Sequence, residues 1–171
     1  MSSIATQLVG SVLFTDLVGF TEFNDLRGDP AAVAVLDQQY EVLESVLGRH
    51  PCSRLVKELG DGLMIWSSDA SDGLEIATEF AAGIRVARET DGFPLAVRLG
   101  LHHGPVIERG DDVVGQTVNV AARIAALAGP GELLVSDEVL AACGTVAAGA
   151  RAVGPVNVKG VADPVWLHRV A

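Results

Sequence analysis

The order in which strand-like and helix-like segments follow one another most constrains the fold of this chain. Short, mostly apolar runs that are typical of strands occupy residues 11–16, 54–57, 63–66, 96–102, 133–136, 153–158 and 165–170. Helical spacing of apolar residues marks segments 29–47, 74–87, 115–128 and 137–143, with Asp29 and Asp137 as expected N-caps. Some strands follow each other directly, whereas others are separated by a helix. This mixed order predicts an α+β sandwich rather than a doubly wound parallel sheet.

Length and composition are those of a single globular domain. The chain has 171 residues, of which 49% are hydrophobic and 20% are charged. A chain of this size can bury roughly 70% of its unfolded surface in one core. We therefore expect one domain over residues 1–171, with a core from about residue 11 to residue 170. The 12 basic and 22 acidic residues give a net charge of −10, which argues against a nucleic-acid partner because such binding uses clustered Lys and Arg.

The cysteines and the first residues of the chain indicate in which cellular compartment the protein is expected. Cys52 and Cys143 form no CxxC pair and no zinc-type cluster, so we expect two buried thiols in a reducing compartment. Residues 1–12 lack a basic leader region, and the chain has no run of 18 uncharged apolar residues. These features favour a cytoplasmic protein with no membrane span in this chain. They are equally compatible with a regulatory domain outside these residues.

Two aspartates stand where strands are expected to end or to turn. Asp16 ends the first apolar run, and Asp61 stands between two glycines at the expected tip of a β-hairpin. Two specific phosphate-binding signatures, GxxxxGK[ST] and GxGxxG, do not occur in the chain. Taken singly, each aspartate is explained as well by a turn or a helix cap. Their meaning therefore depends on the motifs around them.

Four separated motifs follow one another in a fixed order. They are FTDLVGFT at residues 14–21, VKELGDG at 56–62, DVVGQTVNVAAR at 112–123 and NVKG at 157–160. Together they resemble the catalytic domain of class III nucleotidyl cyclases, of the adenylate cyclase type found in bacterial homodimers. The resemblance covers about residues 11–170. It implies a ferredoxin-like βαββαβ-type sandwich with a central, mostly antiparallel sheet, flanking helices and a C-terminal strand pair.

The resemblance also implies roles for individual residues. They fall into metal-binding, substrate-binding and transition-state groups: Asp16, Leu17 and Asp61 for two divalent cations, Mg²⁺ or Mn²⁺; Lys57, Asp112, Phe20, Thr21 and Lys159 for ATP; Asn119 and Arg123 for the transition state. In the family, the metal carboxylates and the transition-state pair come from different subunits. A symmetric homodimer with two composite sites is therefore implied, each site taking Asn119 and Arg123 from the partner.

The chemistry of these residue types agrees with the implied roles. Hard cations prefer oxygen ligands, and two carboxylates that share a site repel each other until a cation neutralises them. Two metal ions could activate the ribose 3′-hydroxyl for in-line attack on the α-phosphorus, after which pyrophosphate leaves. Asn119 and Arg123 are four residues apart on one helix, so both project from the same face. The guanidinium of Arg123 offers a planar fork of donors to the phosphoryl oxygens.

Donor and acceptor counting favours ATP over GTP. Lysine only donates hydrogen bonds, and an ionised aspartate only accepts them. Adenine offers a ring N1 acceptor to Lys57 and an N6 donor to Asp112, whereas guanine reverses both groups. By composition Asp111 is an equally good candidate, and only the spacing to Gly115 and Asn119 selects Asp112. The alternatives are a guanylate cyclase, a catalytically silent nucleotide-binding or dimerisation module, or a general metal-dependent phosphohydrolase.

Two histidines stand at the end of an expected strand. His102 and His103 have no evident carboxylate partner in the sequence. We therefore expect a structural role for both.

Overall fold

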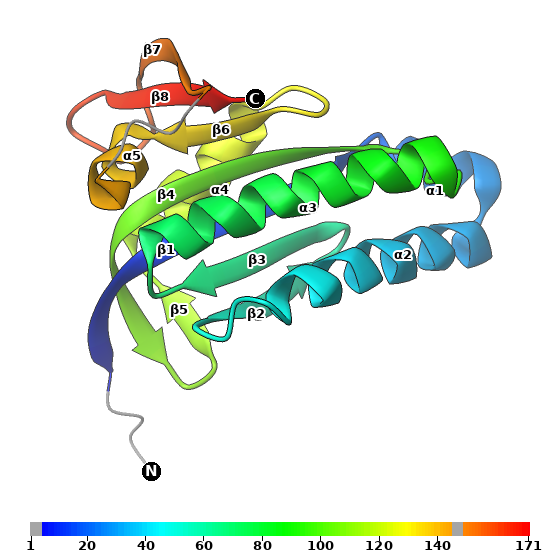
Figure 1. Ribbon diagram of the computed structural model, residues 1–171, viewed down its shortest axis with the longest axis horizontal. Coiled ribbons are helices and arrows are strands. Elements are labelled where there is room, and N and C mark those ends of the chain that lie inside the picture. Colours follow the sequence, from blue (N-terminus) through cyan, green and yellow to red (C-terminus); the bar gives the residue numbers. More distant parts are fainter. Residues whose placement is uncertain (1–4, 145–148) are drawn as a thin grey trace.

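The computed structural model describes residues 5–144 and 149–171, which form one eight-stranded sheet and its helices (Figure 1). The strands are β1 (Thr6–Val18), β2 (Ser53–Leu59), β3 (Gly62–Ser67), β4 (Ala96–Arg109), β5 (Asp112–Val114), β6 (Leu133–Ser136), β7 (Arg151–Val156) and β8 (Val165–Val170). Their spatial order is β2-β3-β1-β4-β6-β8-β7, and β5 pairs with β4. Neighbouring strands are antiparallel, except that β4 and β6 are parallel. The predicted α+β class, with a mostly antiparallel sheet and a C-terminal strand pair, is confirmed.

Helices pack on both faces of this sheet. They are α1 (Phe20–Arg27), α2 (Asp29–Leu47), α3 (Ala70–Thr90), α4 (Gln116–Leu127) and α5 (Asp137–Cys143). Helices α2 and α3 lie side by side (Figure 1) and pack on the face that carries Leu13 and Leu99. Helix α4 packs on the opposite face, against Val12 and Val106. Adjacent strand residues such as Val12 and Leu13 point to opposite faces, so each half of the core uses alternate residues of β1.

The closeness of α4 to the sheet depends on one glycine. Gly100 lies in β4, and a Cβ atom built on it would stand 2.6 Å from the Ala125 Cα in α4. A side chain cannot fit into that space, so α4 rests directly on the backbone of β4. The helix that carries Asn119 and Arg123 is thereby fixed against the centre of the sheet.

Several elements are longer than the sequence pattern indicates. Strand β1 extends to Val18, beyond the predicted end at Asp16, and β4 extends to Arg109. Helix α1 and strand β5 are not predicted from the sequence. A three-residue strand and an eight-residue helix contain too few residues for a periodic pattern to be recognised.

The starts of two helices also differ from the prediction. Gly28 precedes α2 and Ser136 precedes α5, so Asp29 and Asp137 are the first helical residues rather than the N-caps. An acidic side chain in the first helical turn is favoured by the positive end of the helix dipole. The aspartates therefore do mark the starts of the two helices, but they stand one residue after the N-cap position.

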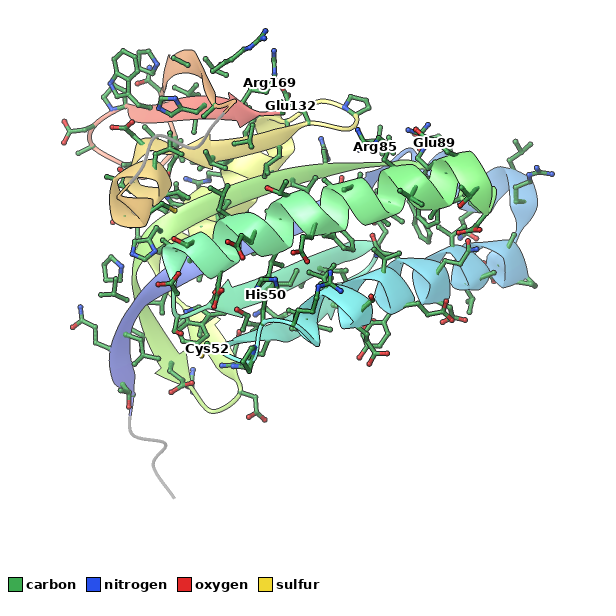
Figure 2. All side chains as sticks on the ribbon, viewed as in Figure 1. His50, Cys52, Arg85, Glu89, Glu132 and Arg169 are labelled. Carbon is green, nitrogen blue, oxygen red and sulfur yellow. The ribbon has the colours of Figure 1, made fainter. Side chains whose placement is uncertain are left out.

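The two cysteines differ in exposure. Both are free thiols, and Cys52 is exposed in the turn between α2 and β2, whereas Cys143 is partly buried at the end of α5 (Figure 2 labels Cys52). The prediction of a buried thiol is therefore wrong for Cys52, because a turn position outweighs the usual preference of cysteine for the interior. In the described part of the chain, the helices are too short or too polar to cross a membrane.

Candidate active site

Asp16 and Asp61 are brought together by the pairing of β1 and β3. Thr15 in β1 lies opposite Leu63 in β3, which places the hairpin turn beside the end of β1. The Leu17 main-chain N–H donates a hydrogen bond of 3.0 Å to Asp61 Oδ2. Burial and then the nearby charge of Asp16 raise the pKa of Asp61. The two predicted metal-binding carboxylates therefore share one site, in which their negative charges repel each other.

The turn that carries Asp61 is held in place by its surroundings. Gly60 has a φ of +67°, a left-handed conformation that favours glycine. Gln39 of α2 is only 1% exposed and donates from Nε2 to the Asp61 carbonyl oxygen at 3.1 Å. No sequence pattern points to Gln39, because a single polar residue inside an apolar helical pattern does not reveal its partner.

Leu17 can contribute only main-chain atoms to this site. Its side chain is 2% exposed and belongs to the core below α2 and α3. Its N–H donates to Asp61 and cannot ligate a cation, so its carbonyl oxygen is the atom that can do so. This oxygen and the carboxylates of Asp16 and Asp61 form the all-oxygen donor set that Mg²⁺ and Mn²⁺ prefer.

Arg98 belongs to the same site, although no sequence motif singles it out. It lies opposite Asp16 in the register of β1 and β4. Its Nε and Nη2 atoms each lie 2.7 Å from Asp16 Oδ2. Its Nη1 atom also donates to the Ala126 carbonyl oxygen of α4 at 3.4 Å. Arg98 therefore neutralises one of the two carboxylates and connects the acidic site to α4.

Lys57 and Asp112 form an ion pair between β2 and β5. Lys57 Nζ lies 2.9 Å from Asp112 Oδ1 and 2.8 Å from Oδ2. The hydrogen bond from Lys57 is the main cause of a lowered pKa of Asp112, and the Val113 N–H also donates to this carboxylate at 2.8 Å. Both side chains remain about 40% exposed, at 39% and 41%. The two residues predicted to recognise the purine are therefore neighbours that a ligand can reach.

The neighbouring aspartates Asp111 and Asp112 have different positions in the structure. Asp112 pairs with Arg109 in the register of β4 and β5, whereas Asp111 lies in the turn before β5. Arg54 of β2 donates to the Asp111 carbonyl oxygen at 2.6 Å and lies 3.4 Å from Glu108 Oε1. Arg54 therefore fixes the turn that carries Asp112. The carboxylate that contacts Lys57 is that of Asp112, the residue selected by spacing, whereas Asp111 accepts from Arg54 through its carbonyl oxygen.

Asn119, Arg123 and Lys159 gather around α4 and the loop after β7. Asn119 is exposed on α4, and Arg123 is partly buried one turn later. A Cβ atom on Gly160 would lie 3.6 Å from Arg123 Nη1, and Gln116 Nε2 donates to the Gly160 carbonyl oxygen at 3.0 Å. The exposed Lys159 is thus held on a loop that is bonded to α4. The three cationic or amide side chains belong to one region of the molecule.

Phe20 and Thr21 open α1 instead of lying in an open turn. Gly19, with a φ of +80°, precedes the helix and reverses the chain. Phe20 packs its side chain on the core below α2 and α3, whereas Thr21 is exposed. The glycine of the motif at residues 14–21 predicts a turn over residues 17–21, but the structure has a strand end followed by a helix start. Since the first N–H groups of a helix lack partners within it, main-chain groups are what Phe20 can offer to a phosphate.

His102 and His103 are each bonded to a serine. His102 Nδ1 lies 2.7 Å from Ser136 Oγ, and His103 Nδ1 lies 2.9 Å from Ser11 Oγ. Burial lowers the pKa of both imidazoles. A carboxylate, Glu138, does lie 3.8 Å from His102 Nδ1, so the expectation of no acidic partner is wrong for His102. The hydrogen bonds of both histidines to serines of neighbouring strands are consistent with a structural role for the two side chains.

The sequence of the chain is that of a known class of catalytic domain. The family model described as the adenylate and guanylate cyclase catalytic domain matches residues 5–169. The chain therefore belongs to the class III adenylate and guanylate cyclase family.

Its similarity extends to curated proteins of both nucleotide specificities. An adenylate cyclase of Mycobacterium tuberculosis is 33% identical over 143 residues, which cover 75% of this chain and 32% of that protein. An adenylate cyclase of Streptomyces griseus is 34% identical over 124 residues, covering 72% and 30%. Retinal guanylyl cyclase 2 of Bos taurus is 26% identical over 178 residues, covering 92% and 16%. The chain thus spans about a third or less of the length of these relatives.

Solved structures of both specificities share the fold. The adenylyl cyclase CyaB from P. aeruginosa has a TM-score of 0.87 at 23% identity, covering 98% of this chain and 95% of that chain. The guanylyl cyclase Cya2 has a TM-score of 0.80 at 25% identity, covering 100% and 94%. Fold similarity alone therefore does not distinguish ATP from GTP.

Proposed function

We propose that this domain is an adenylate cyclase, which converts ATP to 3′,5′-cyclic AMP and pyrophosphate. The observation that carries the choice of ATP is the direct contact of Lys57 Nζ with both carboxylate oxygens of Asp112, at 2.9 and 2.8 Å. A donor and an acceptor therefore stand side by side, as the N1 and N6 edge of adenine requires.

Guanine is mismatched to this pair at both groups. Its O6 acceptor would face Asp112 and its N1–H donor would face Lys57, so that like groups would meet. The lowered pKa of Asp112 keeps the carboxylate ionised, and therefore unable to donate, at neutral pH. Sites that leave polar groups unpaired discriminate by up to about 10⁴-fold in favourable cases. The Lys57–Asp112 pair therefore favours ATP, whereas membership of the family is compatible with either nucleotide.

We propose that the carboxylates of Asp16 and Asp61, together with the Leu17 carbonyl oxygen, bind two Mg²⁺ or Mn²⁺ ions. The raised pKa of Asp61 beside Asp16 supports this, because a cation between the two carboxylates removes their repulsion. Such ions would supply the acidity that ionises the ribose 3′-hydroxyl and would neutralise charge on the triphosphate. Binding at Asp16 requires Arg98 to release at least part of its ion pair.

The reaction makes one bond and breaks one bond at the α-phosphorus. The ribose 3′-oxygen attacks the α-phosphorus, and the bond from that phosphorus to the bridging oxygen of the β-phosphate breaks, which releases pyrophosphate. Arg123 would donate to the α-phosphoryl oxygens as charge develops on them, and Asn119 would orient the ribose. Lys159, on the loop that Gln116 holds, would contact the triphosphate, as would main-chain groups at Phe20 and Thr21.

We further propose that the active form is a symmetric homodimer with two composite sites. Within the described residues, no hydrogen bond or ion pair joins Asn119 or Arg123 to Asp16 or Asp61, whose bonds go to Leu17 and Arg98. Each site would then use the acidic pair of one subunit with Asn119 and Arg123 of the other.

Two further proposals concern the setting of this domain. Because the chain spans about a third or less of its curated relatives, we propose that a regulatory domain outside these residues controls the activity. The two free thiols are compatible with a reducing cytoplasm, where the substrate ATP is made and used.

Identification of the products tests the proposed reaction. The purified chain is incubated with ATP or with GTP in the presence of Mn²⁺, and the products are separated by chromatography. We expect cyclic AMP and pyrophosphate from ATP, and neither from an Asp61→Asn control. A preference for cyclic GMP would establish a guanylate cyclase instead. Linear ADP or AMP would indicate a phosphohydrolase, and bound but unchanged nucleotide would indicate a silent module.

A further inference from the structure

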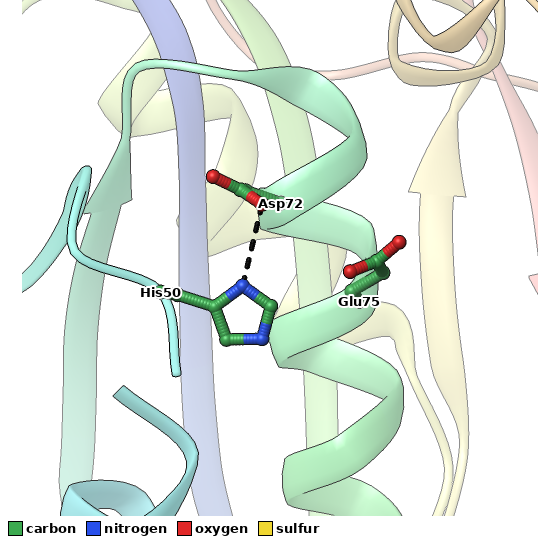
Figure 3. A group of neighbouring side chains, drawn as sticks. All are labelled: His50, Asp72 and Glu75. Carbon is green, nitrogen blue, oxygen red and sulfur yellow. Dashed lines mark hydrogen bonds and ion pairs between the residues drawn. The ribbon is translucent and has the colours of Figure 1, made fainter. Parts of the chain in front are cut away.

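A buried histidine surrounded by carboxylates lies away from the proposed active site. His50 is 5% exposed and lies in the turn between α2 and β2. Asp72 and Glu75, one helical turn apart on α3, face this turn, and ligand atoms of the three residues lie within 4.8 Å of one another (Figure 3). The group sits at the end of the β2–β3 hairpin where Ser53 pairs with Ser67, whereas Asp61 is at the opposite end. It is therefore separate from the acidic pair.

Carboxylates face both ring nitrogens of His50. Nδ1 lies 3.3 Å from Asp72 Oδ1, and Nε2 lies 3.6 Å from Glu79 Oε2. Nε2 is buried and has no hydrogen-bond partner among the described residues. A neutral imidazole carries one N–H, so it can donate to only one of these carboxylates, and its remaining lone pair then faces negative charge. The arrangement calls for a positive charge beside the ring.

The local charge indicates how much positive charge is missing. Asp72, Glu75 and Glu79 contribute three negative charges, and Arg49, whose Nη2 lies 2.5 Å from Glu79 Oε2, contributes one positive charge. With a neutral His50, the group has a net charge of −2. One divalent cation balances it, whereas one proton on the imidazole would leave it at −1.

The geometry also suits a metal ion at Nδ1. An ion about 2.1 Å from each of two ligands at a tetrahedral angle separates those ligands by roughly 3.4 Å, close to the 3.3 Å between His50 Nδ1 and Asp72 Oδ1. Metal-ligating histidines usually donate their other ring N–H to a carboxylate. Glu79 stands at Nε2 in that position, so metal binding would give both ring nitrogens a partner.

Ordinary structural roles account for only part of this group. An acid in the first turn of α3 is favoured by the helix dipole, which explains Asp72. Glu79 has its own surface ion pair with Arg49. Neither explanation covers the exposed Glu75 or the burial of an imidazole among three acids.

We propose that His50, Asp72 and Glu75 bind one divalent transition-metal ion of the Zn²⁺ type, with Glu79 accepting the Nε2–H of His50. Imidazole with carboxylate ligands suits Zn²⁺ better than Mg²⁺, which prefers oxygen alone. The ion joins the α2–β2 turn to the first turns of α3. Its role is to fix this junction rather than to take part in the cyclase reaction.

Zinc titration of a chain with a disabled acidic pair tests this site. In an Asp16→Asn, Asp61→Asn background, calorimetry with Zn²⁺ is expected to give one site per chain. Glu75→Gln, at an exposed position that folding tolerates, should weaken binding at least 10-fold, and His50→Gln should abolish it. Glu89→Gln is the matched control, because Glu89 is exposed at the far end of α3 from His50 (Figure 2), and it should leave the affinity unchanged.

Two further readouts make the result decisive. Zn²⁺ should raise the thermal unfolding temperature of the parent chain but not that of Glu75→Gln, whose metal-free unfolding temperature should match the parent. A Cys52→Ser variant should bind Zn²⁺ as the parent does, because Cys52 is not among the ligands. Unchanged Zn²⁺ affinity and stoichiometry in Glu75→Gln would overturn the proposal, as would binding that disappears with Cys52.

Discussion

The Lys57–Asp112 pair joins opposite charges, whereas the Asp16–Asp61 pair brings two like charges together. In the first, unlike charges are in contact and Lys57 lowers the pKa of Asp112. In the second, like charges share a site and Asp16 contributes to a raised pKa of Asp61. The first pair is balanced within the chain, whereas the second is balanced only in part, by Arg98. In the proposed enzyme, base recognition is therefore formed within the folded chain, whereas the reaction centre needs added cations and a second subunit.

The largest effects should come from breaking the reaction centre. Asp16→Ala and Arg123→Ala chains should each lose about 10³-fold or more in turnover, because each removes charge stabilisation from the transition state. Mixing the two should restore about a quarter of the wild-type activity, since half of randomly formed dimers are mixed and each has one intact site. Cyclic AMP formation is measured before and after mixing.

A matched mixture serves as the control for shared sites. Asp16→Ala mixed with Asp61→Ala should show no recovery, because both substitutions damage the same half of each composite site. Failure of Asp16→Ala and Arg123→Ala to recover, despite demonstrated exchange of subunits, would contradict the composite site.

The Lys57–Asp112 pair should control the preference for ATP over GTP more than the rate of the reaction. Lys57→Met removes the donor to adenine N1 and should lower kcat/KM for ATP by about 10- to 100-fold, the range for a hydrogen bond to a charged group. The GTP reaction should fall less, because Lys57 is mismatched to guanine. Steady-state kinetics with both nucleotides give the ratio. An equal loss for ATP and GTP would show that Lys57 does not read the base.

A smaller effect is expected from Arg54, which holds the turn that carries Asp112 of the Lys57–Asp112 pair. Arg54→Met removes the bond to the Asp111 carbonyl oxygen and should raise KM for ATP about 2- to 10-fold with kcat little changed. Arg54→Lys should recover part of the loss. The same measurements on Arg88→Met, an exposed change on α3, provide the control. A fall in kcat at constant KM would mean that Arg54 acts elsewhere.

The smallest effect concerns the pH dependence of stability without metal. A raised pKa means that folded Asp61 holds its proton at a pH where the unfolded chain has released it. Its stabilising contribution is therefore complete below the unfolded pKa of about 4 and is lost as pH rises through the folded pKa. Urea unfolding of metal-free protein from pH 4 to 7 should show this loss in the wild type but not in Asp61→Asn. Mg²⁺ or Mn²⁺ should reduce it, and identical pH profiles would contradict the raised pKa.

Local patterns were sufficient to predict much of the fold and the positions of several candidate site residues. Gly60 and Gly62 frame Asp61, so the hairpin and its acidic tip follow from turn chemistry. The family resemblance proposes Asn119 and Arg123, and helical spacing places both on α4 one turn apart. In these cases the neighbours that determine the structure are also neighbours in the sequence.

Contacts between distant segments could not be predicted in this way. The bond from Arg98 to Asp16 joins strands 82 residues apart, and it depends on the register of β1 and β4. The contact of Lys57 with Asp112 depends on β5 and joins residues 55 apart, and the exposure of Cys52 depends on the path of one turn. Each is set by tertiary packing, which the local composition around these residues does not encode.

The contact between Gly100 and Ala125 restricts how such a domain could be controlled. With no side chain between helix and strand, α4 packs directly on the backbone of β4, so a shift of α4 along the sheet would disturb the centre of the core. In the proposed homodimer, an activating signal would then act by rotating one subunit against the other, which changes the alignment of the two half-sites. Gly100→Ala would push α4 outward and uncouple that alignment from any signal.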